Sequence, residues 1–223
     1  MTKALAYTVS ILFHPLLIPS YVLITLLAIN PFMFGVNSVW ANDIILLQVF
    51  LSTFLLPAFS LLMLRQLDFV KTIELEDRED RIIPFIVTGL FYIGLAVFFI
   101  KTPNHSPIIL TVFILGATIG LWLSFLFNLF TKISLHAVAI AGFLAIIIIA
   151  MNSLEFDHMI LDLGSLGILN ISIRTMLMLV ILIAGMVGTA RLLLRAHEPF
   201  QIYLGYFVGF LSQFVANNFL TNF

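Results

Sequence analysis

A short polar stretch between two long apolar runs holds the residues best suited to chemistry. Arg191, Arg195 and His197 stand there, followed by Pro199 and Gln201. Ionisable groups beside membrane-length apolar sequence are costly unless function or a partner retains them. Proline disfavours the α conformation of the preceding residue and is favoured at the first position of a helix, so one helix should end near His197 and another begin at Pro199. That elbow would let Arg191 and His197 converge, whereas in one unbroken helix they would point about 120° apart.

Two cations stand seven residues apart in the most charged segment, residues 65–81. A helix through Lys71 and Arg78 would place both on one face, about 10 Å apart along its axis. Two cations aimed at one point suit a phosphate or diphosphate, with arginine supplying a planar fork. The segment also fits a solvated interfacial helix, because i,i+4 ion pairs such as Asp77 with Arg81 would stabilise it without any ligand.

A second break falls at the start of another apolar run, where Ser134 and His136 stand. Serine is a preferred N-cap, and the free N–H groups of a helix start, with the positive end of its dipole, attract anions. His136 lies in that first turn, and an imidazole exchanges protons near neutral pH. Taken alone, the pair also fits a capping serine beside an interfacial histidine.

The elements that must position these residues are transmembrane helices. Of 223 residues, 62% are hydrophobic and 9% are charged, far more apolar side chains than a soluble core of this size could hide. The formal net charge of −1 argues against a nucleic-acid partner. The absence of cysteine excludes disulfides and thiol chemistry.

We therefore predict an all-α, polytopic transmembrane helix bundle of about six to seven spans, forming a single integral membrane domain over residues 1–223. Each span needs about 20 apolar residues. The spans are expected at roughly 11–30, 44–64, 82–100, 108–130, 135–151, 173–194 and 199–219. His14-Pro15 and Pro19 are expected to kink the first of them. Residues 152–170 are expected to form a polar, partly acidic loop.

We call the three polar groups constellations: the segment 65–81, the break with Ser134 and His136, and the elbow from Arg191 to Gln201. Two predicted spans separate each constellation from the next, so all three should lie on one membrane face and can meet. That face also collects most of the basic residues, with only Lys101 and Arg174 on the other. The positive-inside rule makes the richer face cytoplasmic. The expected location is the inner (plasma) membrane of a bacterium.

Together, the three constellations resemble the signatures of the type 2 phosphatidic acid phosphatase family. Those signatures read Lys-x6-Arg-Pro, Pro-Ser-Gly-His and Ser-Arg-x5-His-x3-Asp, in that order. The chain matches them with six residues: Lys71, Arg78, Ser134, His136, Arg191 and His197. It departs from them at Glu79, Ile133, Leu135, Ala190 and Gln201. The matching stretch runs from Lys71 to Gln201.

The resemblance implies a membrane-embedded phosphatase acting through a phosphohistidine intermediate. His197 would attack phosphorus, His136 would protonate the departing lipid alkoxide, and Gln201 would orient His197. The phosphate oxygens would be held by four residues: Lys71, Arg78, Ser134 and Arg191. No metal and no cofactor is implied.

The expected partner is a membrane lipid substrate, either a lipid phosphate or a polyprenyl diphosphate, which would enter sideways from the bilayer and release phosphate. No nucleic acid is expected, and the oligomeric state is left open. The enzyme class would be that of a phosphoric monoester or diphosphate hydrolase.

Two other functions remain open. Gln201 stands where the family has aspartate, and its amide can accept a hydrogen bond from histidine but brings no charge. The chain could therefore be a non-catalytic lipid-head-group binding protein or a transporter. The acidic run from Glu74 to Asp80 also suggests an intramembrane prenyltransferase of the Mg²⁺-diphosphate type. Enzymes of that class resemble one another in having two aspartate-rich loops on the same membrane face. Here the second acidic cluster, Asp157 to Asp162, is expected on the opposite face.

Overall fold

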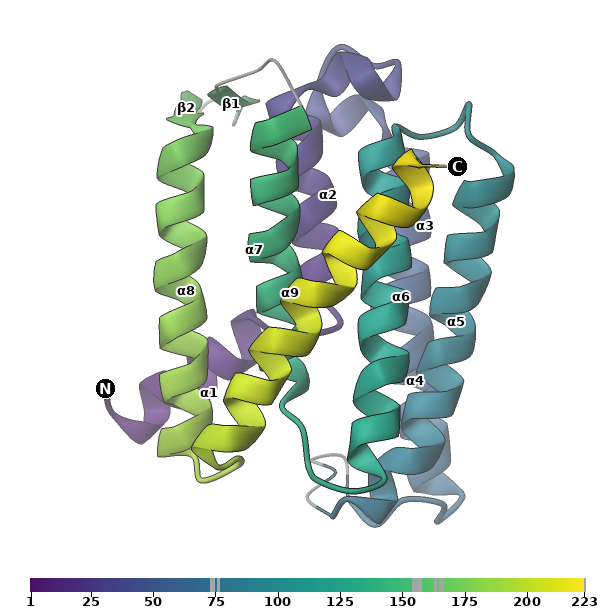
Figure 1. Cartoon of the computed structure of the whole chain (residues 1–223), viewed down its shortest axis with the longest axis vertical. Helices are drawn as coiled ribbons and strands as arrows, with labels where there is room; N and C mark the ends of the chain where they lie inside the picture. The colour runs from purple at the N-terminus through teal and green to yellow at the C-terminus, as the bar shows by residue number, and fades with distance from the viewer. Residues whose placement is uncertain (73–74, 76, 154–157, 163, 165–166, 223) are drawn as a thin grey trace.

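The computed structural model describes residues 1–72, 75, 77–153, 158–162, 164 and 167–222. The described chain is a bundle of helices whose long axes run roughly side by side, with a small β-hairpin at one end (Figure 1). Its helices are α1 (Lys3–Leu12), α2 (Ile18–Ile29), α3 (Asp43–Phe50), α4 (Leu56–Gln66), α5 (Ile82–Lys101), α6 (Ile108–Asn128), α7 (Leu135–Ser153), α8 (Ile173–Leu193) and α9 (Pro199–Thr221). The predicted all-α architecture is confirmed.

Five helical segments within the described residues are long and apolar enough to cross a membrane. They are Asp43–Gln66, which joins α3 to α4 through a π-helical turn at Leu51–Leu55, and then α5, α6, α7 and α8. A sixth span results if α2 and the short helices after it, bent by 112°, count as one. The chain is therefore a membrane protein built of transmembrane helices. α9 is also long, with 23 residues, but it carries Gln213, Asn217 and Asn218 and is not one of these apolar spans.

The first predicted span is broken, not merely kinked. α1 ends at Leu12 and α2 begins at Ile18, with His14 and Pro15 between them. Proline removes a backbone donor and clashes with the preceding turn, which accounts for the break. Tyr21 donates its hydroxyl to the Leu12 carbonyl at 2.9 Å, so a side chain satisfies one carbonyl left open at the end of α1.

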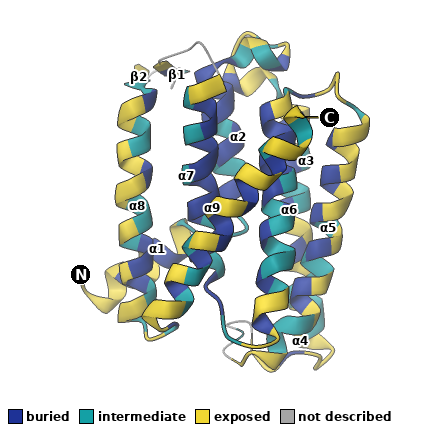
Figure 2. Cartoon of the chain, viewed as in Figure 1, coloured by how far each residue is buried: buried dark blue, intermediate teal, exposed yellow. Residues whose placement is uncertain are grey.

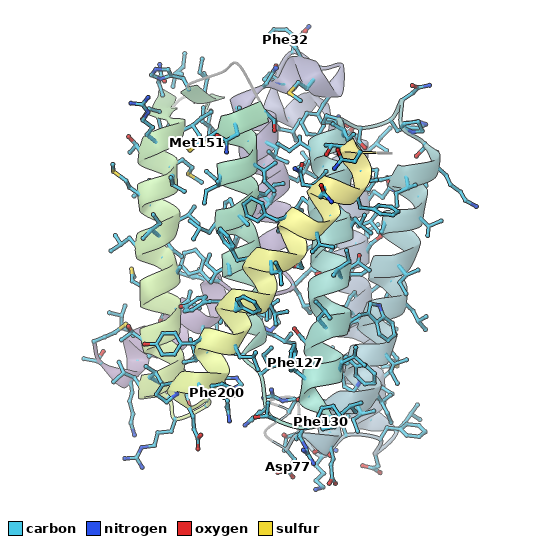
Figure 3. The ribbon with its side chains drawn as sticks, viewed as in Figure 1. Phe32, Asp77, Phe127, Phe130, Met151 and Phe200 are labelled. Atoms are coloured by element: carbon cyan, nitrogen blue, oxygen red, sulfur yellow. The ribbon has the colours of Figure 1, made fainter. Side chains whose placement is uncertain are left out.

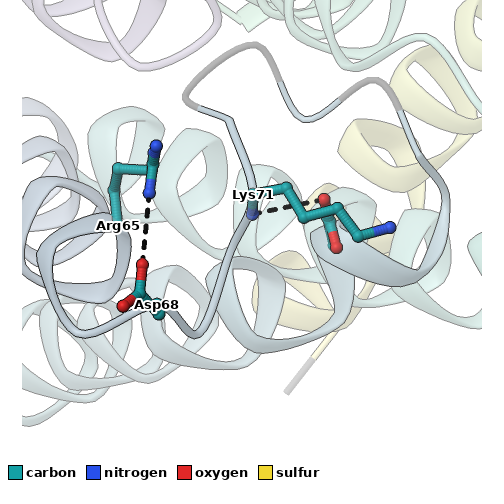
Figure 4. Close-up of polar contacts among 4 residues, drawn as sticks. Arg65, Asp68 and Lys71 are labelled. Atoms are coloured by element: carbon teal, nitrogen blue, oxygen red, sulfur yellow. Dashed lines mark hydrogen bonds and ion pairs between the residues drawn. The ribbon is translucent and has the colours of Figure 1, made fainter.

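The predicted helix through Lys71 and Arg78 is wrong: the described residues between α4 and the short helix Glu79–Arg81 form turns. Asp68 and Leu75 there adopt left-handed backbone angles, with φ of 59° and 51°. The charged side chains bond across the loop. Arg65 reaches Asp68 at 3.5 Å (Figure 4), and the Lys71 ammonium reaches Asp77 at 3.1 Å. These contacts replace the i,i+4 pairs that a helix would have formed.

The predicted 152–170 loop contains a β-hairpin among its described residues. Strand β1 (His158–Asp162) pairs antiparallel with β2 (Ile168–Ser172), with His158 opposite Ser172 and Asp162 opposite Ile168. Ser172 then caps α8 by accepting a hydrogen bond from the Thr175 N–H at 3.1 Å. The hairpin lies at the end of the bundle that holds Met151 and Phe32 (Figures 1 and 3).

The opposite end of the bundle gathers the three predicted constellations, and we call it the motif end. Asp77 from the α4–α5 loop, Phe130 from the α6–α7 connection and Phe200 from the start of α9 all lie there (Figure 3). α1 lies at the same end, packed against α8 (Figure 1). The predicted sharing of one face is therefore confirmed as an arrangement of the bundle.

α7 and α9 pack closely at the centre of the bundle. α7 is the most buried of the apolar spans (Figure 2), and α9 crosses it diagonally (Figure 1). Gly205 and Gly209, four residues apart on α9, make the crossing possible: a Cβ at Gly205 would stand 2.7 Å from the Ser134 carbonyl oxygen, and one at Gly209 would run into the Val138 carbonyl. Small residues at this spacing let membrane helices approach backbone to backbone.

We predict that Gly209→Ala strongly destabilises the protein, by roughly 1–3 kcal/mol, because backbone atoms of α7 cannot move aside as a flexible side chain would. Gly94→Ala on α5 is the matched control, since a Cβ there meets nothing within 4 Å. Thermal unfolding of the purified protein in detergent measures both. Equal melting temperatures for the two variants would show that α7 and α9 do not pack in this way.

Candidate functional site

A cavity of about 220 Å³ lies inside the bundle, and most of its wall is apolar. Side chains from α2, α4, α5, α6, α7 and α9 contribute to this wall, among them Leu61, Phe85 and Leu121. Its charged and imidazole groups come from five residues: His14, Arg81, His136, Arg191 and His197. No carboxylate occurs among the described residues that line it. A largely apolar cavity whose described lining has two guanidinium groups and no acidic side chain suits an anion attached to a hydrophobic body.

The elbow between α8 and α9 brings Arg191 and His197 to this cavity. α8 ends at Leu193, four residues before His197, and the chain reverses through Arg195, whose φ of 52° is left-handed. The Ala196 N–H donates to the Arg191 carbonyl at 3.1 Å, the bond that closes a helix with a left-handed residue after its end. α9 starts at Pro199 as predicted, and both side chains line the cavity.

The hydrogen bonds of Gln201 fix which nitrogen of His197 carries the proton. The Gln201 Oε1 lies 3.0 Å from His197 Nδ1 and also accepts the Glu198 N–H at 3.3 Å. An amide oxygen only accepts, so in this pair Nδ1–H must be the donor. Within the described chain Nε2 has no hydrogen-bond partner, and in the neutral ring it keeps its lone pair. His197 is therefore held in the tautomer that a nucleophile needs.

Burial keeps that ring neutral. His197 is 8% exposed, and burial lowers its pKa to about 3, opposed by the bond to Gln201 and reinforced by the positive charges of Arg81, Arg191 and Lys132. The imidazole is thus unprotonated at neutral pH, with Nε2 free to bind or attack an electrophile.

Ser10 of α1 joins two of the predicted site residues. Its carbonyl lies 3.0 Å from His136 Nε2, so that nitrogen must donate and Nδ1 is the free nitrogen of His136. Its hydroxyl accepts from Arg191 Nη1 at 3.4 Å, while the buried Arg191 Nε has no partner among the described residues. The His14 ring lies edge-on to His136, with ring centroids 5.6 Å apart.

Arg81, not Arg78, lines the cavity. Arg81 is braced by two backbone carbonyls, donating from Nε to Leu75 at 2.8 Å and from Nη1 to Ile133 at 3.2 Å. Arg78 instead donates to the Phe130 carbonyl at 2.9 Å and supports the α6–α7 connection from outside the cavity wall. The charged loop therefore supplies one arginine to the cavity, three residues beyond the expected position.

Lys71 also lies outside the cavity wall. Its ammonium pairs with Asp77, and its side chain is 72% exposed. The hydrogen bond to Asp77 raises the pKa of Lys71, with the charges of Asp77 and Asp80 acting in the same direction. The loop thus satisfies this cation internally, and the structure does not bring it together with the two site histidines.

Ser134 is the N-cap of α7, as predicted. Its hydroxyl accepts the Ala137 N–H at 3.5 Å, and its own N–H donates to the Gln201 carbonyl at 3.3 Å. The serine is fully buried and outside the cavity wall, whereas the next two residues, Leu135 and His136, line the cavity. The start of α7 therefore faces the cavity through its first turn, and Ser134 ties that turn to α9.

Sequence reasoning missed Ser10, His14 and Arg81 as site residues. His14 stands beside a helix-breaking proline in an apolar run, and Arg81 opens the span that contains Pro84, so each carried a weak signal. Ser10 carried none, because its role comes from contacts to residues more than 120 positions away.

The described residues contain no group of three His, Asp or Glu side chains placed to hold a metal ion. Glu74 and Glu76 of the acidic run lie outside the described residues. Asp162, from the second acidic cluster, is in β1 at the end of the bundle away from the motif end.

Comparison with known proteins identifies no relative: no family model, no curated protein and no solved structure matches the chain.

We predict that Arg191→Lys weakens binding of inorganic phosphate to the cavity at least tenfold, because an ammonium cannot replace the two-pronged contact of a guanidinium. Arg195→Lys is the matched control, since Arg195 is exposed in the same elbow. Isothermal titration calorimetry on the purified protein measures both affinities. Equal affinities for Arg191→Lys and Arg195→Lys would exclude Arg191 from the anion site.

Proposed function

We propose that the protein is a membrane-embedded phosphatase that hydrolyses a lipid phosphate or a polyprenyl diphosphate, with His197 as the nucleophile. The observation that carries this proposal is the bonding of Gln201 Oε1, which leaves His197 Nε2 unprotonated at a cavity lined by Arg81 and Arg191. The resemblance of the three constellations to the type 2 phosphatidic acid phosphatase signatures supports the same function.

In the first step, His197 Nε2 attacks phosphorus, a P–N bond forms, and the P–O bond to the lipid breaks. The leaving oxygen takes a proton from His136. For this role His136 must carry a proton on Nδ1, since Nε2–H already donates to the Ser10 carbonyl. That carbonyl accepts from the ring in both protonation states, so it holds His136 in place while Nδ1 gains and loses the proton.

In the second step, water attacks the phosphohistidine. His136 Nδ1, now unprotonated, accepts a proton from that water, and phosphate leaves as His197 Nε2 recovers its lone pair. Arg81 and Arg191 neutralise the charge on the phosphoryl oxygens in both steps. The first step therefore leaves His136 Nδ1 unprotonated, as the second step requires, and the second step returns the proton for the next cycle.

The apolar wall of the cavity supports a lipid substrate. Leu61 and Leu64 of α4 and Leu121 of α6 line it alongside the charged residues of the motif end. An acyl or prenyl chain would bury its surface there, while a soluble phosphate ester would leave that wall without a partner. The basic residues at the motif end favour a cytoplasmic orientation in a bacterial plasma membrane.

One observation favours a second function, binding of a lipid head group without catalysis. Gln201 offers His197 a neutral acceptor, so nothing on that side stabilises the imidazolium-like charge that develops during attack. A site that holds a phosphate but turns it over slowly would serve a binding protein or a transporter.

We predict that the purified protein releases phosphate from a lipid phosphate in detergent micelles and that His197→Ala reduces the rate by at least a thousandfold. His105→Ala is the control, because His105 is exposed in the loop between α5 and α6. Malachite-green detection measures the released phosphate. Retention of the wild-type rate by His197→Ala would exclude His197 as the nucleophile, whereas absence of activity from the wild-type protein would favour the binding function.

We further predict that Gln201→Glu speeds phosphate release. Glutamate matches glutamine in length, so its carboxylate can accept the same two hydrogen bonds and adds a charge that stabilises the forming cation. The pKa of His197 should rise in this variant, as histidine chemical shifts in an NMR titration would report. A raised pKa without a faster rate would show that charge beside Nδ1 does not limit the reaction.

A further inference from the structure

The partners of the three cavity histidines determine which nitrogen each ring offers to a ligand. His197 offers Nε2 without a proton, because Nδ1–H donates to Gln201. His136 offers Nδ1, because Nε2–H donates to Ser10. In their neutral forms, both of these cavity-lining rings therefore keep one unprotonated nitrogen and have no second N–H to donate.

His14 differs from both. Its Nδ1 accepts the Leu16 N–H at 3.4 Å, so the proton of the neutral ring must lie on Nε2. Burial, with a smaller contribution from the charge of Arg191, lowers the pKa of His14, which keeps the ring neutral. Within the described chain Nε2 makes no hydrogen bond, and the ring lines the cavity. His14 is thus the one neutral imidazole among these three that offers an N–H.

The position of His14 is suited to the leaving-group side of a bound phosphate. Its ring centroid lies 5.6 Å from that of His136, which the proposed mechanism places at the departing oxygen, and the two ring planes meet at 81°. Two rings at this separation reach different oxygens of one ligand, since a hydrogen bond spans about 3 Å from each ring nitrogen. The positive charge of Arg191 also acts on His14, so the two belong to one electrostatic environment.

We propose that His14 is a third histidine of the anion site and binds substrate by donating Nε2–H to a phosphoryl oxygen. This assignment rests on the proposed function, because it requires a phosphate held between Arg191 and His136. His14 comes from the break between α1 and α2, outside all three sequence constellations. The break therefore contributes a binding group in addition to ending a helix.

Two substitutions separate this role from a purely structural one. In His14→Asn, the side-chain oxygen can occupy the place of Nδ1 and keep the bond from the Leu16 N–H, but the Nε2–H donor is lost. In His14→Gln, the side-chain amide can place an N–H near the position of Nε2, but the acceptor for Leu16 is lost. His105→Asn controls for removal of an exposed histidine.

The experiment measures inorganic phosphate binding by calorimetry, and thermal stability, for the wild-type protein and the three variants. If His14 binds phosphate, His14→Asn loses affinity by roughly ten- to a hundredfold at nearly unchanged stability, while His14→Gln retains most of the affinity. The opposite pattern, with His14→Asn binding like the wild type and His14→Gln unstable, would overturn the assignment and leave the proposed function intact. A wild-type protein that binds no phosphate would overturn the anion site itself.

Discussion

The geometry around His197 depends on one hydrogen-bond acceptor, the side-chain oxygen of Gln201. It accepts a hydrogen bond from the Glu198 N–H at the N-terminus of α9, and the Glu198 side chain accepts one from the Gln201 N–H. These two reciprocal bonds form a capping box. The same oxygen lies 3.0 Å from His197 Nδ1. A motif that ordinarily stabilises a helix start therefore also fixes the orientation and tautomer of the histidine that faces the cavity.

That arrangement holds only because α9 is anchored to α7 close to the site. The Ser134 N–H donates to the Gln201 carbonyl at 3.3 Å, and Gly205, one turn further along α9, allows close approach to the first turn of α7. His136 lies in that same turn. The two histidines are thus positioned by a single helix crossing, so movement of α9 relative to α7 would displace both.

Local chemistry in the sequence predicted much of the fold and part of the site. The apolar runs gave the helices from α3 to α9 to within a few residues, because each run is bounded by charges, turns or proline. Pro199 predicted the elbow, since proline fixes the start of a helix regardless of the rest of the fold. Ser134 and His136 were found because a helix start is itself a local feature.

The rest of the site depends on contacts that sequence spacing does not encode. The 65–81 segment has the charge spacing of a helix, yet Lys71 pairs with Asp77 and Arg65 with Asp68 across turns, so Arg81 reaches the cavity in place of Arg78. Ser10 and His14 join the site through the packing of α1 and the break after it against α7 and α8. Nothing in their own neighbourhood indicates that His136 and Arg191 lie beside them.

If His197 is the nucleophile, its Nε2 forms a bond to phosphorus, and trapping that bond is the most direct test. The purified protein would be mixed with a lipid phosphate labelled with ³²P, quenched in alkali within milliseconds, digested and mapped by mass spectrometry. Phosphohistidine is stable in alkali and labile in acid, so we expect an alkali-stable, acid-labile label on the peptide that contains His197. A label on another residue, or unlabelled protein during active turnover, would contradict it.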